Sequence, residues 1–168
     1  GAFPETDPLS LGMLGMHGMA FANYAVEDCD FLIALGARFD DRVAGNPPKF
    51  ARNAKAIAHI DIDASEINKV KPVQWKHVGL LPEALRALTA HGRRARIALD
   101  VDEWLAQCAA MKRKYAMNYD RSSKLIQPYR IIEEINRLTK GEAIIATGVG
   151  QHQMWAAQYL DYRHPRSF

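Results

Sequence analysis

The stretch FLIALGA, residues 31–37, decides the fold that we predict for this chain. It is a nearly unbroken apolar run that stops at Gly36, and such a run is typical of a strand buried on both faces of a sheet. A second run, AIAHIDI at residues 56–62, ends in the same fashion with Asp61 and Asp63. The two runs predict two buried strands, each followed by polar residues.

Helical patterns surround these runs. Residues 19–27 read as a helix with one apolar side, and SEINKV at residues 65–70 begins another. HVGLL at residues 77–81 predicts a short third strand, and PEALRALTA at residues 82–90 predicts a helix with proline at its start. Alternating helices and strands indicate a parallel sheet flanked by helices.

The second half of the chain is organised differently. Residues 89–99 are basic and lack periodicity, which favours a linker, and residues 102–119 predict a helix. One side of that helix reads as a packing face and carries Trp104, Cys108, Met111 and Tyr115. Residues 128–160 then read as helix (128–139), strand EAIIAT (142–147), loop GVGQ and helix (152–160). This single unit has too few elements to bury its own apolar surface.

Composition excludes several classes of protein. The 168 residues are 48% apolar and 24% charged with a net charge of +3, so we expect a folded protein of one ordinary domain or two small ones. The only dense basic cluster, HGRRAR at residues 91–96, has no interleaved aromatics, and no apolar run approaches a membrane span. We therefore expect no nucleic-acid partner and no membrane association.

The two cysteines, Cys29 and Cys108, lie far apart and in no CxxC or Cys/His cluster. This favours reduced thiols over a disulfide or a zinc site, and it predicts a cytoplasmic location. The chain begins at Gly1 rather than at methionine, and both ends have the look of cuts within a longer sequence. His17 and His152 lack partners at ligand spacing, so no metal ligand is predicted.

Three glycine-bearing stretches suggest ligand binding. GMLGMHGMAF, residues 12–21, has glycines at three-residue spacing ahead of a helix, which indicates tight turns or close approach of a ligand to the backbone. Gly36, Arg38 and Arg42 belong with Asp61 to the loops that follow the two buried strands. Ligands of open α/β sheets bind at such strand ends, where a carboxylate accepts ribose hydroxyls and arginine pairs with phosphate. The alternative is a local salt-bridge network within RFDDR.

The third stretch is TGVGQHQM, residues 147–154, between a predicted strand and a helix. Gly148 and Gly150 permit a tight turn, and the free amides at the helix start favour a phosphate. Gln151 and His152 could add side-chain hydrogen bonds. A simple turn without a ligand is the alternative.

Four collinear motifs, LGMLGMHG, GARFDDRV, HIDID and VGQHQMWAAQ, resemble the large catalytic subunit of acetohydroxyacid synthase, also called acetolactate synthase. The resemblance spans nearly the whole chain. It implies a transferase that uses thiamine diphosphate, magnesium and FAD. Such an enzyme decarboxylates pyruvate and joins the two-carbon unit to a second pyruvate or to 2-oxobutyrate, in branched-chain amino-acid biosynthesis.

The resemblance also implies roles for particular residues. The flavin region would contact Leu14, Gly15, Met16 and His17, with the glycines keeping side chains away from the ring. The ribityl and phosphate portion of FAD would contact Gly36, Ala37, Arg38, Asp40, Arg42 and Val43. Its adenosine end would contact Asp61 and Ile62. The diphosphate of thiamine diphosphate would contact Val149, Gly150, Gln151 and His152.

Two positions depart from the family pattern. Leu80 stands where the family usually has an aspartate near the adenosine, so one hydrogen bond to FAD would be lost. Gly148 stands where members often carry an acidic residue, which would loosen that turn.

The resemblance defines a fold class and a domain division. The class is α/β, a partial Rossmann-like parallel sheet followed by a helical linker and the first αβα unit of a thiamine-diphosphate domain. Residues 1–88 would be the later part of the central FAD domain, residues 89–124 the linker, and residues 125–168 the start of the diphosphate domain.

The family's activating glutamate and its magnesium segment would lie outside the chain. We therefore expect no catalytic or metal-binding residue here, thiamine diphosphate and Mg²⁺ only in the full-length enzyme, and no activity of the chain alone. Small 2-oxo acids are the implied substrates, a homo-oligomer is expected, and a regulatory small subunit is a further candidate partner. The alternative is a non-catalytic nucleotide-binding module, or one that completes its half-sheet by pairing with another copy.

Overall fold

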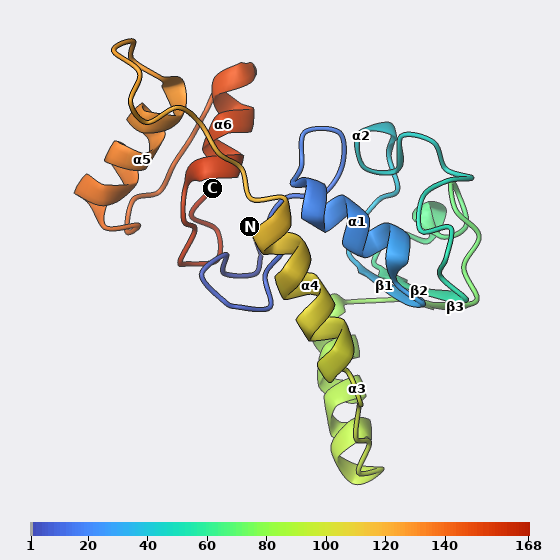
Figure 1. Cartoon of the computed structure of the whole chain (residues 1–168). Coiled ribbons are helices and arrows are strands. Elements are labelled where there is room, and N and C mark those ends of the chain that lie inside the picture. Colours follow the sequence, from blue (N-terminus) through green and yellow to red (C-terminus); the bar gives the residue numbers. More distant parts are fainter. Residues whose placement is uncertain (1) are drawn as a thin grey trace. The chain divides into compact units, whose positions relative to one another are not determined.

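A computed structural model describes residues 2–168 and divides into two compact units (Figure 1). The sheet unit is Asn23–Ala109, and the terminal unit combines Gly1–Ala22 with Ala110–Phe168. The elements in chain order are α1 (Ala20–Asp28), β1 (Phe31–Leu35), α2 (Asp41–Ala44), β2 (Ala56–Asp61), the 3₁₀ turn η1 (Ala64–Glu66), β3 (Trp75–Val78), α3 (Leu81–Arg94), α4 (Asp102–Lys114), α5 (Pro128–Thr139) and α6 (Gln151–Tyr159).

The sheet unit contains a three-stranded parallel sheet in the order β1-β2-β3, as the alternation of strands and helices predicted. Phe31 pairs with Ala56 at one end of β1, and Leu35 pairs with Ile60 at the other. On the other side of β2, Asp61 pairs with Val78 of β3. The α/β class is therefore correct, and the carboxyl ends of β1 and β2 lie at the same edge of the sheet.

Burial corrects one expectation about these strands. β2 is central and buried along almost its whole length, whereas β1 is an edge strand whose alternate side chains Phe31, Ile33 and Leu35 are exposed. The prediction of burial on both faces is thus wrong for β1. Both runs are largely apolar, but only β2 has neighbouring strands on both edges, whose side chains flank and help to cover its own.

The opposite side of β1 contributes to the core of this unit. Ala34 and Ile57 pack with Phe39, Ala44 and Ala51 from the connection between the strands. The Phe39 and Phe50 rings meet edge to face with centroids 5.8 Å apart. The connection between β1 and β2 therefore supplies three of the five buried residues of this cluster, which explains why a segment with so many charges and prolines is ordered.

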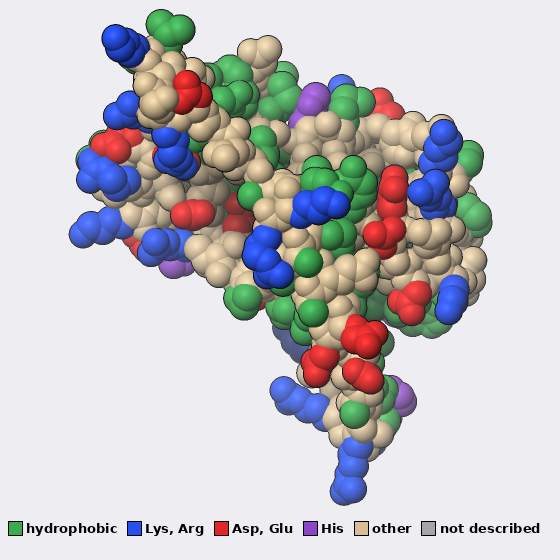
Figure 2. Space-filling view, in the orientation of Figure 1, with side chains coloured by type: hydrophobic (Ala, Val, Ile, Leu, Met, Phe, Trp, Pro, Cys, Tyr) green, Lys and Arg blue, Asp and Glu red, His purple; other side chains and the backbone are tan. Residues whose placement is uncertain are grey.

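Several element boundaries differ from the predictions. The third strand begins at Trp75 rather than at residue 77, and the helix expected at 65–70 is only the turn η1. Helix α4 ends at Lys114 rather than at residue 119, and α3 continues into the expected linker as far as Arg94. Helix α3 is strongly amphipathic, and its last turn is basic. The basic residues cluster at the solvent-exposed end of this helix (Figure 2).

The terminal unit contains α5 and α6 but not the strand predicted between them. Residues 142–147 form no strand; the Glu142 N–H donates to the Thr139 carbonyl at 3.0 Å, and the Ile145 N–H donates to the Ser167 carbonyl at 2.8 Å. Ile145 packs beside Ala156, Leu160 and Tyr162, whereas Ile144 is 83% exposed. A strand exists only through pairing with another strand, and none of the described residues supplies one.

None of the helices formed by the described residues is long and apolar enough to cross a membrane.

Candidate functional site

The predicted ligand loops of the sheet unit lie beyond the carboxyl ends of β1 and β2. Gly36 directly follows β1 and has φ +59°, a backbone conformation that favours glycine. Its N–H donates to the Ile60 carbonyl at 2.8 Å, which ties the start of this loop to β2. A Cβ here would meet only the Leu81 side chain at 3.7 Å, so Gly36 serves the turn and leaves open space beside it.

The RFDDR segment combines a helix cap with exposed charges. The Asp40 side chain accepts a hydrogen bond from the Val43 N–H at 3.1 Å and so caps the N-terminus of α2. Arg38 lies 3.6 Å from the Asp40 carboxylate, and Arg42 lies 3.9 Å from Asp41. These pairs are the local network that the alternative interpretation predicted. They are long and solvent-exposed, so each contributes little and both guanidinium groups are accessible to a phosphate.

The Asp61 carboxylate is fixed by its own loop. One oxygen, Oδ1, accepts the Asp63 N–H at 2.9 Å, and the Asp61 carbonyl accepts the Gly79 N–H at 2.9 Å. Asp63 in turn accepts hydrogen bonds from Ser65, which lower the pKa of the Asp63 carboxyl. Ile62 between them is exposed. The structure therefore collects Gly36–Val43 and Asp61–Ile62 at one edge of the sheet.

Sequence reasoning missed His59, two residues before Asp61. Its side chain is completely buried, and neither ring nitrogen has a hydrogen-bond partner among the described residues. The available signal was a single histidine inside an otherwise apolar strand sequence, AIAHIDI. A buried polar group without a partner requires a physical explanation.

The glycine segment before α1 belongs to the terminal unit and forms a compact turn. The Met19 N–H donates to the Met13 carbonyl at 2.7 Å, and the Gly18 N–H donates to the Gly15 carbonyl at 2.9 Å. A Cβ on Gly18 would lie 2.4 Å from the Met13 carbonyl oxygen and 2.5 Å from the Leu14 carbonyl carbon. The close approach that Gly18 permits is therefore that of the chain to itself.

The predicted flavin contacts in this turn differ in exposure. Leu14 is half-buried and Gly15 is buried, whereas Met16 and His17 are exposed. The Gln158 side chain of α6 donates a hydrogen bond to the His17 carbonyl at 2.7 Å. The turn is thus connected to the helix that begins with Gln151.

The start of α6 has the features of an anion site. Gly150 occupies the N-cap position, and none of the described side chains caps the helix there. Val149 is 96% exposed, and Gln151 and His152 are also exposed. The His152 ring lies back over the turn, because a Cβ on Gly150 would meet it at 2.8 Å. Free amides and two polar side chains at one helix start are a suitable arrangement for a diphosphate.

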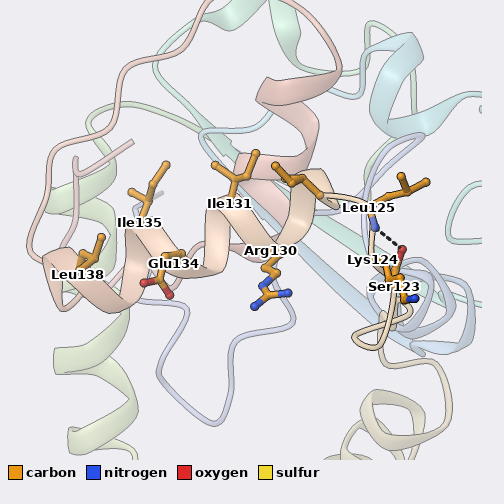
Figure 3. Close-up of a pocket in the computed structure, with 9 residues that line it drawn as sticks. Ser123, Lys124, Leu125, Arg130, Ile131, Glu134, Ile135 and Leu138 are labelled. Atoms are coloured by element: carbon orange, nitrogen blue, oxygen red, sulfur yellow. Dashed lines mark hydrogen bonds between the residues drawn. The ribbon is translucent and has the colours of Figure 1, made fainter.

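Two of the hollows among the described residues lie away from the predicted ligand loops. One, of about 470 Å³, lies between residues 123–126 and α5, with Ile131, Ile135 and Leu138 along its floor (Figure 3). The other, of about 430 Å³, lies between β3 and α3 and includes Trp75 and Leu88. Both are lined mainly by apolar side chains. No group of three or more metal-ligating side chains is present among residues 2–168.

The three-stranded parallel sheet with its connecting loops at the carboxyl edge places the chain in the α/β class, whose ligands commonly bind at such edges. Comparison with known families agrees, because the profile described as "Thiamine pyrophosphate enzyme, central domain" matches residues 1–88. The chain belongs to the thiamine pyrophosphate enzyme family.

Similar full-length proteins are acetolactate synthases, which confirms the resemblance to that enzyme. The chain is 49% identical to "Acetolactate synthase 1, chloroplastic" of Zea mays, 47% identical to "Acetolactate synthase 2, chloroplastic" of Nicotiana tabacum and 45% identical to "Acetolactate synthase, chloroplastic" of Arabidopsis thaliana. Each alignment covers 100% of this chain. The chain spans about a quarter of the length of these relatives, 25–26%.

The same relatives correct the expected location. The prediction was cytoplasmic, but the relatives from maize, tobacco and Arabidopsis are all named chloroplastic. The prediction was based on two unpaired cysteines, and Cys29 and Cys108 are indeed free. Free thiols indicate a reducing environment, which more than one compartment provides, so the argument was too weak to identify the cytoplasm.

Proposed function

We propose that this chain is part of an acetolactate synthase. The proposed reaction joins two pyruvates, or pyruvate and 2-oxobutyrate, with loss of CO₂ in branched-chain amino-acid biosynthesis. The observation that carries this proposal is identity of nearly one half along the whole chain to proteins with that name. In that enzyme the domain division would be residues 1–88, 89–124 and 125–168 as the sequence predicts. The expected homo-oligomer and regulatory small subunit belong to this proposal too.

The loops of the sheet unit would hold FAD. The open space beside Gly36 and the accessible guanidinium groups of Arg38 and Arg42 suit its phosphates, and Asp61 suits the hydroxyls of its ribose. Asp40 and Val43 would shape this loop through the α2 cap. In the terminal unit, residues 14–17 would contact the flavin region.

The residues at the start of α6 would hold the diphosphate of thiamine diphosphate, which supplies the electron sink for decarboxylation of a 2-oxo acid when bound. The uncapped amides after Gly150 and the Gln151 and His152 side chains would donate hydrogen bonds to its oxygens. Mg²⁺ would be bound by segments outside these 168 residues. Because the chain spans only about a quarter of its relatives, we expect the isolated chain to be inactive.

Acetolactate formation from pyruvate, with FAD, thiamine diphosphate and Mg²⁺ added, tests the reaction. We expect turnover from the natural polypeptide that carries this sequence and none above a blank from the isolated 168 residues. No acetolactate from the natural polypeptide would refute the assigned activity, and turnover by the isolated chain would refute its inactivity.

Flavin binding tests the loop assignment separately. We expect Arg38→Ala in the natural polypeptide to weaken FAD binding about tenfold, because a phosphate loses a charged partner. The matched control is Arg52→Ala, since Arg52 is also exposed and has an ion pair of 3.9 Å, to Glu27. Equal affinity in both variants would contradict the assignment.

A second candidate function is self-association through the sheet. The exposed side chains Phe31, Ile33 and Leu35 of the edge strand β1 favour it. Sedimentation of this chain would decide, with Ile33→Lys abolishing a dimer that forms through this surface.

A further inference from the structure

The completely buried His59 side chain is the starting point. It lies on β2, and both of its ring nitrogens lack hydrogen-bond partners among the described residues. A neutral imidazole carries one N–H, and an unpaired N–H in the interior destabilises the folded state. A buried, unpaired N–H suggests an acceptor that pairs with it in another state of the protein.

The surroundings of His59 identify that partner. The Phe39 ring meets the imidazole edge to face, with centroids 5.2 Å apart, and offers no acceptor of ordinary strength. The Asp61 carboxylate is a strong acceptor, and its Oδ2 lies 3.7 Å from His59 Nε2. Its other oxygen, Oδ1, already accepts the Asp63 N–H at 2.9 Å. A shift of about 0.8 Å would bring Nε2 and Oδ2 to hydrogen-bond distance.

We propose that His59 is a positioning residue for nucleotide binding. When a nucleotide with free ribose hydroxyls occupies the loops after β1 and β2, His59 Nε2–H donates to Asp61 Oδ2. With Asp63 N–H on one oxygen and His59 on the other, the carboxylate is held in one orientation, and its remaining lone pairs accept the ribose hydroxyls. His59 itself is too buried to contact the ligand. This inference rests on the proposed role of Asp61.

Two amide substitutions separate this role from plain packing. The amide nitrogen of Gln can occupy the place of Nε2, whereas that of Asn reaches only the place of Nδ1. We expect His59→Gln to bind FAD within about twofold of the wild type and His59→Asn about tenfold more weakly, since a hydrogen bond to a charged group is lost. His59→Phe should also bind about tenfold more weakly, while its FAD-free form melts no lower than the wild type. The matched control is His77→Asn, on the exposed strand β3.

The measurement is the dissociation constant of FAD, from quenching of flavin fluorescence, in the natural polypeptide that carries this sequence. Asp61→Asn should weaken binding by itself, and adding His59→Asn to it should cause no further loss, because both act through one carboxylate. If Asp61→Asn leaves the affinity unchanged, the proposed nucleotide site fails. If Asp61→Asn weakens binding but His59→Asn does not, or if the two losses multiply, the positioning role alone is overturned.

The role of His59 can still be tested if some of these variants do not fold. Should His59→Asn and His59→Phe not fold, His59→Gln and Asp61→Asn are compared with each other. Wild-type affinity in His59→Gln together with weakened binding in Asp61→Asn supports the role of an Nε2 donor, and a tenfold loss in His59→Gln overturns it.

Discussion

Strands were predicted from similar apolar runs in two regions: the sheet of residues 31–78, and the helical pair of residues 128–159 with its connecting segment. Only the sheet contains strands. In the sheet, β2 finds parallel partners on both edges within its own unit. In the helical pair, the apolar segment at 142–147 lies between two helices and pairs with no strand among the described residues. An apolar pattern therefore predicts the capacity to form a strand, and a neighbouring strand decides whether one forms.

Substitution of one isoleucine in each region tests this contrast most strongly. Ile60 of β2 is 0% exposed and Ile144 is 83% exposed. We expect Ile60→Ala to lower the free energy of unfolding by about 2–5 kcal/mol through lost burial and a cavity, and Ile144→Ala by less than about 0.5 kcal/mol. Urea unfolding followed by circular dichroism measures both. A comparable loss in both variants would mean that residues 142–147 are paired in solution.

The two glycine turns of the terminal unit extend the comparison. A Cβ on Gly18 would collide with backbone atoms of Met13 and Leu14, whereas one on Gly148 would meet only the His152 side chain at 3.7 Å. We expect Gly18→Ala to destabilise the chain by about 2 kcal/mol and Gly148→Ala by less than about 0.5 kcal/mol. Thermal unfolding of the two variants checks this. If Gly18→Ala is harmless, the compact turn does not describe the segment in solution.

A substitution at the start of helix α3 should stabilise the sheet unit rather than destabilise it. Leu80 occupies its N-cap position and provides no side-chain hydrogen bond to the free amides there. Leu80→Asp should stabilise the chain by about 1 kcal/mol, because a carboxylate caps these amides and interacts favourably with the helix dipole. Leu80→Ala is the control, since it removes the same side chain without supplying a cap. Equal unfolding midpoints for the two variants would count against the capping explanation.

The stability of the terminal unit should depend on pH, and this effect is smaller. Burial raises the pKa of the Glu5 carboxyl from 4.5 to about 7, and the neighbouring Asp161 carboxylate adds to the rise. The folded chain therefore keeps a proton that the unfolded chain releases near pH 4.5. The resulting stabilisation is complete below about pH 4.5 and is lost as the pH rises through 7.

Solvent reaches this half-buried carboxyl, so we expect the loss to be below about 1 kcal/mol. Urea unfolding at pH 5 and pH 8 measures it, with Glu5→Gln as the variant that lacks the titrating group. The difference between the two pH values should shrink in Glu5→Gln. An unchanged difference would show that Glu5 does not titrate in this way.

Local patterns were sufficient for most of the helices and for the sheet. Pro128 at its first position and a strong apolar periodicity fixed α5 at the residues predicted, and the runs at 31–37 and 56–62 gave β1 and β2 to within two residues. The ligand loops were also predictable in position, because glycine and aspartate directly follow those runs. The binding roles assigned to these loops stay predictions.

Long-range pairing accounts for what the sequence could not reveal. The apolar residues of β1 do not indicate that it is an edge strand. Those of residues 142–147 do not indicate that none of the described residues supplies a partner strand. His59 looked like an ordinary residue of a strand until its buried, unpaired nitrogens and its distance from Asp61 were known. Residue order sets which segments are apolar and where they turn. Hydrogen bonds between distant segments decide which of them become strands and which side chains meet, since their partners lie elsewhere in the chain.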